Sequence, residues 1–216
     1  EMYHPLIPEG VRNSITAERS VLLTGSNASG KSTFIKTVAL NAILAQTLHT
    51  VLAENYQASW FCIASSMALR DDILSQESYY IVEIRSLKRI LDLTRLSELP
   101  VLCFIDEVLR GTNTVERIAA SSRILQAIAE QGGLCFAATH DIELTYLLEK
   151  EYDNYHFEEQ VEDDKVTFDY CLREGRACTR NAIRLLKMLG YDEKIVDDAN
   201  ERVALFLKSG NWVSSH

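Results

Sequence analysis

Apolar runs of strand length alternate along the chain with longer segments whose apolar residues recur at helical spacing. The strand-like runs cover 20–24, 59–64, 101–106 and 134–139, and the helical patterns cover 31–48, 78–96 and 114–131. Several of these strand-like runs are apolar almost throughout, which is typical of parallel strands buried on both faces. The alternation therefore predicts an α/β fold with a mostly parallel sheet flanked by helices.

The last third of the chain has a different pattern. The segments 154–160 and 165–172 alternate apolar and polar residues around an acidic turn near 162–164, which predicts an antiparallel hairpin within 150–175. Two more helical patterns follow between 180 and 208, and Gly190 between them is typical of a helix C-cap. The length of 216 residues fits a single domain with a sizeable core. Because the chain opens with Glu1 rather than Met, we expect a fragment of a longer protein.

Charge and cysteine usage narrow the class of protein. The net charge of −9 argues against a large nucleic-acid-binding surface on this chain. The five cysteines form no CxxC pair and several lie in apolar runs, so we expect buried free thiols in a reducing, cytoplasmic compartment. No apolar run approaches the roughly 20 residues that span a bilayer, so we expect no membrane segment.

A glycine-rich stretch between the first predicted strand and the first predicted helix gives the clearest indication of a binding site. Residues 25–32, GSNASGKS, fit the P-loop pattern G-x-x-x-x-G-K-[ST]. Glycines allow successive N–H groups to point into one hollow, and the following helix N-terminus favours an anion there. We expect the phosphates of ATP to be bound by Gly25, Ser26, Asn27, Ala28, Ser29, Gly30, Lys31, Ser32 and Thr33.

Two strand ends supply the other groups that a phosphoryl-transfer site needs. Asp106 ends the run VLCFID, and together with the Ser32 hydroxyl it is our candidate ligand for Mg²⁺. Glu107 beside it can orient or deprotonate an attacking water. His140 follows the next buried strand, where its ring could contact a γ-phosphate.

These segments together resemble the C-terminal ATPase domain of MutS-type DNA mismatch repair proteins. TGSNASGKST is similar to the family's T-G-P-N-M-G-G-K-S-T, and SYYIVEI to its S-T-F-M-V-E-M. FIDEVLRGTNTVERIAAS resembles I-D-E-[IL]-G-R-G-T-[ST]-x-x-[DE]-G-x-x-[IL]-A. ATHDIELT resembles A-T-H-[YF]-x-E-L, and YHPLI resembles R-H-P-[VL]-[IV]. The likeness covers nearly the whole chain and implies a P-loop ATPase domain over 1–216.

The resemblance also implies a homodimer in which each ATP site is completed by the partner chain. Ser78, at the start of the helix 78–96, would then face the γ-phosphate bound by the other chain. Val11 and Tyr170 fall where the family contacts the adenine, and Tyr170 could stack on the base. DNA would be contacted by domains outside this fragment.

Departures from the family pattern suggest a divergent branch, and two alternative functions stay open beside the leading one. Ala28 and Ser29 replace the usual M-G before Gly30, and Leu109 replaces a glycine. One alternative is an ABC-type or chromosome-maintenance ATPase, since LSQES at 74–78 partly matches L-S-G-G-Q. The other is an interaction module that binds ATP with little turnover.

Overall fold

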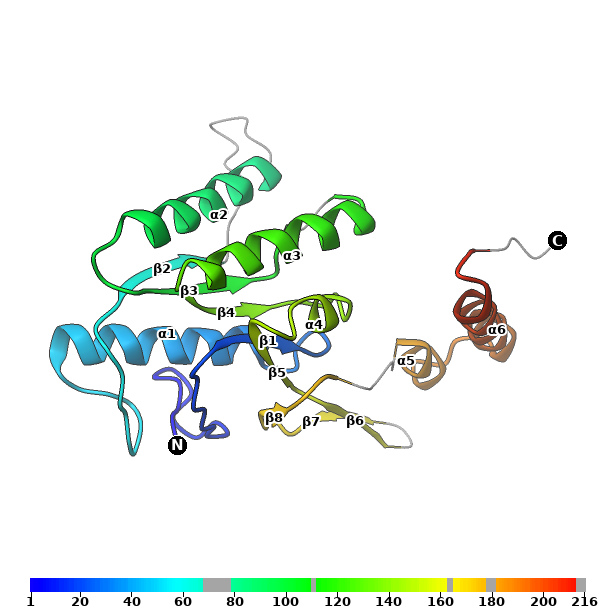
Figure 1. Ribbon diagram of the computed structural model, residues 1–216. Coiled ribbons are helices and arrows are strands. Elements are labelled where there is room, and N and C mark those ends of the chain that lie inside the picture. The colour runs from blue at the N-terminus through cyan, green and yellow to red at the C-terminus, as the bar shows by residue number, and fades with distance from the viewer. Residues whose placement is uncertain (68–78, 110–111, 163–164, 178–181, 213–216) are drawn as a thin grey trace. The chain divides into compact units, whose positions relative to one another are not determined.

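The computed structural model describes residues 1–67, 79–109, 112–162, 165–177 and 182–212 (Figure 1). Contacts divide the chain into two compact units. The first comprises Glu1–Glu158 and Tyr170–Ala177, and the second comprises Glu159–Asp169 and Cys178–His216. None of the helices in the described part of the chain is long and apolar enough to cross a membrane.

The first unit is built on a six-stranded sheet with the order β2-β3-β4-β1-β5-β8. Its strands are β1 Ser20–Thr24, β2 Cys62–Ser66, β3 Val101–Asp106, β4 Leu134–Ala138, β5 Tyr152–His156 and β8 Arg173–Glu174. The first five are parallel, and the two-residue β8 pairs antiparallel with β5. The predicted α/β class with a mostly parallel sheet is therefore confirmed.

Helices cover both faces of this sheet. Helix α1 (Lys31–Leu48) lies on one face, and α2 (Tyr79–Leu96) and α3 (Thr114–Glu130) lie on the other (Figure 1). The short α4 (Leu144–Leu147) follows β4. Alternate residues of one strand thus enter different cores: Leu22 packs with the α2 and α3 residues, while Val21 and Leu23 pack with α1. Because both faces are covered, all five residues of β1 are buried, which explains its continuous apolar run.

The structure corrects the predicted extent of the hairpin. Residues Tyr152–His156 form a parallel strand beside β1 instead of the first arm of a hairpin. The hairpin itself is confined to β6 (Glu159–Glu162) and β7 (Lys165–Phe168). The error has a physical cause: β5 lies near the sheet edge, with its middle residues only partly buried, so it alternates like a hairpin strand. The second predicted strand is also displaced, from 59–64 to Cys62–Ser66.

The second unit contains this hairpin and two helices, α5 (Ala182–Met188) and α6 (Glu193–Ser209), as the sequence predicts for the C-terminal end. Asp192 caps α6 through its side chain, which accepts a hydrogen bond from the Lys194 N–H. Gly190 has a φ of 78° after α5, the left-handed conformation expected of a C-cap glycine. That residues 1–216 act as one ATPase domain stays a prediction.

Candidate functional site

The glycine loop, residues 25–30, joins the end of β1 to the start of α1. Gly25 and Gly30 have positive φ angles of 142° and 109°. A Cβ on Gly25 would lie 2.7 Å from the carbonyl oxygen of Phe157, so this position requires glycine. Ala28 also has a positive φ, of 63°, whereas Ser29 does not. The backbone at Ser29 therefore accepts a side chain in place of the glycine that the resembled motif has there.

Lys31 is folded back over this loop. Its ammonium donates hydrogen bonds of 2.7 Å to the carbonyl oxygens of Gly25 and of Ser26, and the residue is only 5% exposed. The hydroxyl oxygens of Ser26 and Ser29 are buried, with no hydrogen-bond partner among the described residues. The loop thus combines a buried cation with polar groups whose hydrogen-bonding capacity is not used within the described structure.

The second half of the site lies at the ends of the neighbouring strands. Asp106 ends β3, and its Oδ1 is buried without a hydrogen-bond partner in the described part of the chain. Glu107 follows in a left-handed conformation with a φ of 60°, and its N–H donates to the carbonyl oxygen of Ala138 at 3.0 Å. The His140 Nε2 lies 2.9 Å from the Glu107 Oε1. The structure therefore brings the two predicted catalytic residues into direct contact.

Helix α3 contributes an ion pair close to this contact. The Arg117 guanidinium donates two hydrogen bonds, of 2.9 and 2.6 Å, to the carboxylate of Asp141. Hydrogen bonding to Asp141 raises the pKa of Arg117, and the nearby carboxylates of Glu143 and Glu107 add to the effect. A fixed positive charge thus stands beside the turn that carries His140.

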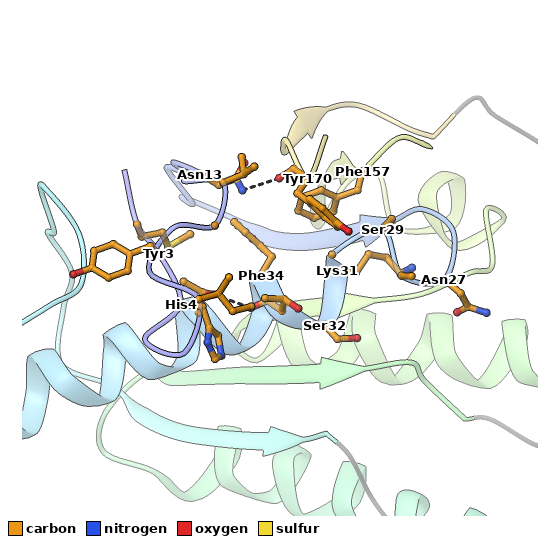
Figure 2. Close-up of a pocket in the computed structure, with 18 of the residues that line it drawn as sticks. Tyr3, His4, Asn13, Asn27, Ser29, Lys31, Ser32, Phe34, Phe157 and Tyr170 are labelled. Atoms are coloured by element: carbon orange, nitrogen blue, oxygen red, sulfur yellow. Dashed lines mark hydrogen bonds between the residues drawn. The ribbon is translucent and has the colours of Figure 1, made fainter. Parts of the chain in front are cut away.

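A pocket of about 460 Å³ opens over the glycine loop (Figure 2). Ten residues predicted for the site line it: Val11, Asn27, Ala28, Ser29, Gly30, Lys31, Ser32, Thr33, Glu107 and Tyr170. Four other predicted site residues lie in the same loops and strand ends but do not line this pocket: Gly25, Ser26, Asp106 and His140. Ser78 lies outside the described residues, as do Arg110, Gly111 and the LSQES segment.

Sequence reasoning missed much of the other wall of the pocket. This wall includes Tyr3, His4, Ile7, Asn13, Phe34 and Phe157. The segment YHPLI, already singled out for its likeness to the family, was the available signal for Tyr3 and His4. Phe157 was hidden by the incorrect hairpin assignment, and nothing in the local sequence indicates Asn13.

Asn13 holds the backbone beside Tyr170. Its Nδ2 donates to the Tyr170 carbonyl oxygen at 3.0 Å (Figure 2). Its Oδ1 accepts a hydrogen bond from the Leu172 N–H at 2.7 Å. Tyr170 has a φ of 54°, and its Cδ1 would lie 3.2 Å from a Cβ on Gly30. The glycine loop and the Tyr170 ring are therefore in close contact, and together they form one side of the pocket.

The chain is similar to curated DNA mismatch repair MutS proteins. It is 35% identical to the protein of Natronomonas pharaonis over 188 residues, which is 85% of this chain and 22% of that protein. It is 32% identical to the Aquifex pyrophilus protein over 209 residues, covering 92% of this chain and 24% of the relative. It is 31% identical to the Thermus thermophilus protein over 185 residues, which is 85% of this chain and 22% of that protein.

The chain therefore corresponds to less than a quarter of the length of these relatives. The sequence model of the family described as MutS domain V matches residues 21–206, which include the glycine loop, the acidic strand end and His140. On this evidence the chain belongs to the MutS family, as a domain V.

Proposed function

We propose that this chain binds Mg·ATP at the glycine loop and hydrolyses it to ADP and phosphate. The observation that carries the proposal is the grouping of Lys31, Asp106, Glu107 and His140 at one edge of the sheet. Strand β4 lies between β1 and β3, so the loop after β1 and the acids after β3 are two strand spacings apart, about 10 Å. This gap leaves room for a terminal phosphate, with the His140 turn, which follows β4, between the two sides.

The glycine loop supplies the phosphate-binding groups. Its N–H groups and the positive end of α1 suit an anion, and the loop backbone has the glycine conformations that such a cradle needs. The Lys31 ammonium already lies over the loop, held by two carbonyl oxygens. A bound triphosphate would replace these carbonyls as the partner of the ammonium, so little side-chain reorganisation is needed.

Ser32 and Asp106 would hold the metal ion. Both offer the oxygen ligands that Mg²⁺ prefers, and the buried Asp106 Oδ1 has an unused acceptor position in the described structure. Mg²⁺, when bound, would supply neutralisation of the charge that develops on the phosphates. The residues present therefore fit this cofactor.

Glu107 and His140 would act on the attacking water. The Glu107 carboxylate can accept a hydrogen bond from the water and orient it, or remove its proton. The contact with His140 fixes the direction of this carboxylate. Val11 and Tyr170, which line the pocket, would contact the adenine.

For the full protein, we propose a role like that of the relatives whose printed name is DNA mismatch repair protein MutS. Two copies of this domain would pair so that each site is completed by the partner, with Ser78 facing the partner's γ-phosphate. Hydrolysis would then change the arrangement of DNA-engaging domains that precede or follow this chain.

Calorimetry and a phosphate-release assay test this proposal. We expect heat of binding with Mg·ATP, and turnover per chain that rises with protein concentration. Glu107→Gln should bind ATP as well as the wild type but turn it over about 10²–10⁴-fold more slowly. Glu130→Gln, on the exposed end of α3, is the matched control and should be as active as the wild type.

Two results would contradict the proposal in different ways. Absence of binding heat at millimolar Mg·ATP would refute the nucleotide site itself. Binding with negligible turnover at every protein concentration would favour the alternative of an interaction module.

A further inference from the structure

The ion pair between Arg117 and Asp141 has the geometry of a specific positioning contact. Arg117 lies in the first turn of α3, and Asp141 directly follows His140. The guanidinium and carboxylate meet through two parallel hydrogen bonds, and their side chains are only 24% and 12% exposed. Two-point contact between these planar groups fixes orientation as well as distance, and partial burial keeps water from competing.

The turn that carries His140 is fixed on both sides of that residue. The Thr139 N–H donates to the Leu23 carbonyl oxygen at 2.9 Å, which ties the turn to β1. The Asp141 N–H donates to the Thr139 hydroxyl at 3.0 Å, and the Asp141 carboxylate is held by Arg117. His140 therefore has its backbone anchored to β1 on one side and to α3 on the other, with its ring against Glu107.

Both members of the pair depart from the motifs that the chain otherwise resembles. Arg117 stands where the segment after I-D-E has a glycine, and Asp141 stands where A-T-H is followed by an aromatic residue. A glycine and an aromatic ring cannot form this contact, so neither change alone would create it. The two departures are 24 positions apart in the sequence and meet in space as one bidentate ion pair.

We propose that Arg117 and Asp141 are a pair of positioning residues that hold His140 in contact with Glu107. The role deepens the proposed ATPase function and rests on it. The pair acts by fixing the turn 139–141 relative to the start of α3, and we assign it no direct role in binding the nucleotide or the attacking water. Without this ion pair, the His140 ring can move away from Glu107. A displacement of this kind lowers the rate of a reaction that depends on the orientation of its groups.

A double-mutant cycle with amide variants tests the pair. Arg117→Gln and Asp141→Asn keep the approximate size of each side chain but remove its charge. We expect each single variant to lower kcat by about 10–100-fold while KM changes little, because ground-state binding uses the glycine loop. If the residues act as a pair, the double variant is no slower than the slower single variant. Losses that multiply in the double variant, or singles with wild-type kcat, would overturn the proposal.

A second readout separates this proposal from the ATPase proposal. The chain has five histidines, so a His140→Asn variant identifies the His140 ring resonance by difference in an NMR spectrum. We expect this resonance to shift in both single variants and to have the same position in the double variant as in the single variants. This result is expected even if the protein hydrolyses no ATP. Arg123→Gln, on the exposed face of α3, is the matched control and should leave it unchanged. An unchanged resonance in Asp141→Asn would refute the positioning role irrespective of activity.

Discussion

Gly25 and Gly175 offer a direct test of what the glycine loop requires. Both residues have positive φ angles, of 142° and 94°. A Cβ on Gly25 would lie 2.7 Å from the Phe157 carbonyl oxygen and 3.0 Å from the Ser29 hydroxyl oxygen. A Cβ on Gly175 would meet nothing within 4 Å. The two alanine variants therefore share the backbone penalty and differ in the steric one.

The expected losses follow from these two terms. An L-residue held at a sparsely populated φ costs roughly 1–3 kcal/mol, and this cost applies to both variants. Forcing a methyl group against a packed carbonyl adds about 1–3 kcal/mol for Gly25→Ala alone. Gly25→Ala should thus lose roughly 2–6 kcal/mol of unfolding free energy, a large share of the 5–15 kcal/mol typical of a domain.

Urea unfolding followed by far-UV circular dichroism measures both variants under the same conditions. The midpoint should fall further for Gly25→Ala than for Gly175→Ala, with similar slopes if both unfold in two states. Equal losses in the two variants would refute the argument that the Phe157 carbonyl excludes a side chain from this position.

Three further predictions concern other parts of the molecule. Glu83, buried on α2, accepts a hydrogen bond from the Leu109 N–H. Glu83→Leu removes this acceptor and should lower the unfolding free energy by about 1–3 kcal/mol. Glu83→Gln keeps an acceptor and should lower it by less. Urea unfolding of both variants checks this, and equal losses would contradict it. Tyr170→Ala should weaken ATP binding in calorimetry by about 0.5–1.5 kcal/mol, while Tyr170→Phe keeps wild-type affinity; loss in both variants would point to the hydroxyl instead of the ring. A hydrogen bond with Cys135 and burial raise the pKa of Cys103 above the ordinary cysteine value of about 8.5. At a pH above that ordinary value, the unfolded chain therefore releases a proton from Cys103 that the folded chain keeps. Unfolding free energy should therefore fall as the pH rises beyond that value, and the fall should be shallower in Cys103→Ala; an identical pH profile would refute the assignment.

The part of the site that lies close together in sequence could be predicted well. Strand β1 and helix α1 have the bounds that the pattern predicts, because a fully buried strand, a glycine loop and a helix start each leave a local signal. The free thiols were also predicted: among the described residues, Cys103 and Cys135 are buried, while Cys62 and Cys171 are partly exposed.

The contacts that close the site depend on distant segments and left no such signal. Asn13 is 157 positions from Tyr170, whose backbone it holds. The register of β5 against β1 brings Phe157 beside Gly25, yet the alternating pattern of that strand suggests a hairpin. The left-handed conformations of Glu107 and Leu109 are likewise invisible in the sequence, since neither residue is a glycine.

Whether this site attracts an anion depends on the charges close to it, and not on the net charge of −9. Exposed charges more than about 8 Å away are largely screened at physiological ionic strength, so the groups close to the glycine loop matter most. Within that distance the loop offers N–H groups, a helix N-terminus and the Lys31 ammonium, all of which attract an anion. Asp106 and Glu107, at the end of β3, would repel it. Under the proposed function, a triphosphate would therefore fit between these two sides only with a cation that bridges it to the acids, and the buried Asp106 Oδ1, whose acceptor position is unused in the described structure, would be a ligand for that cation.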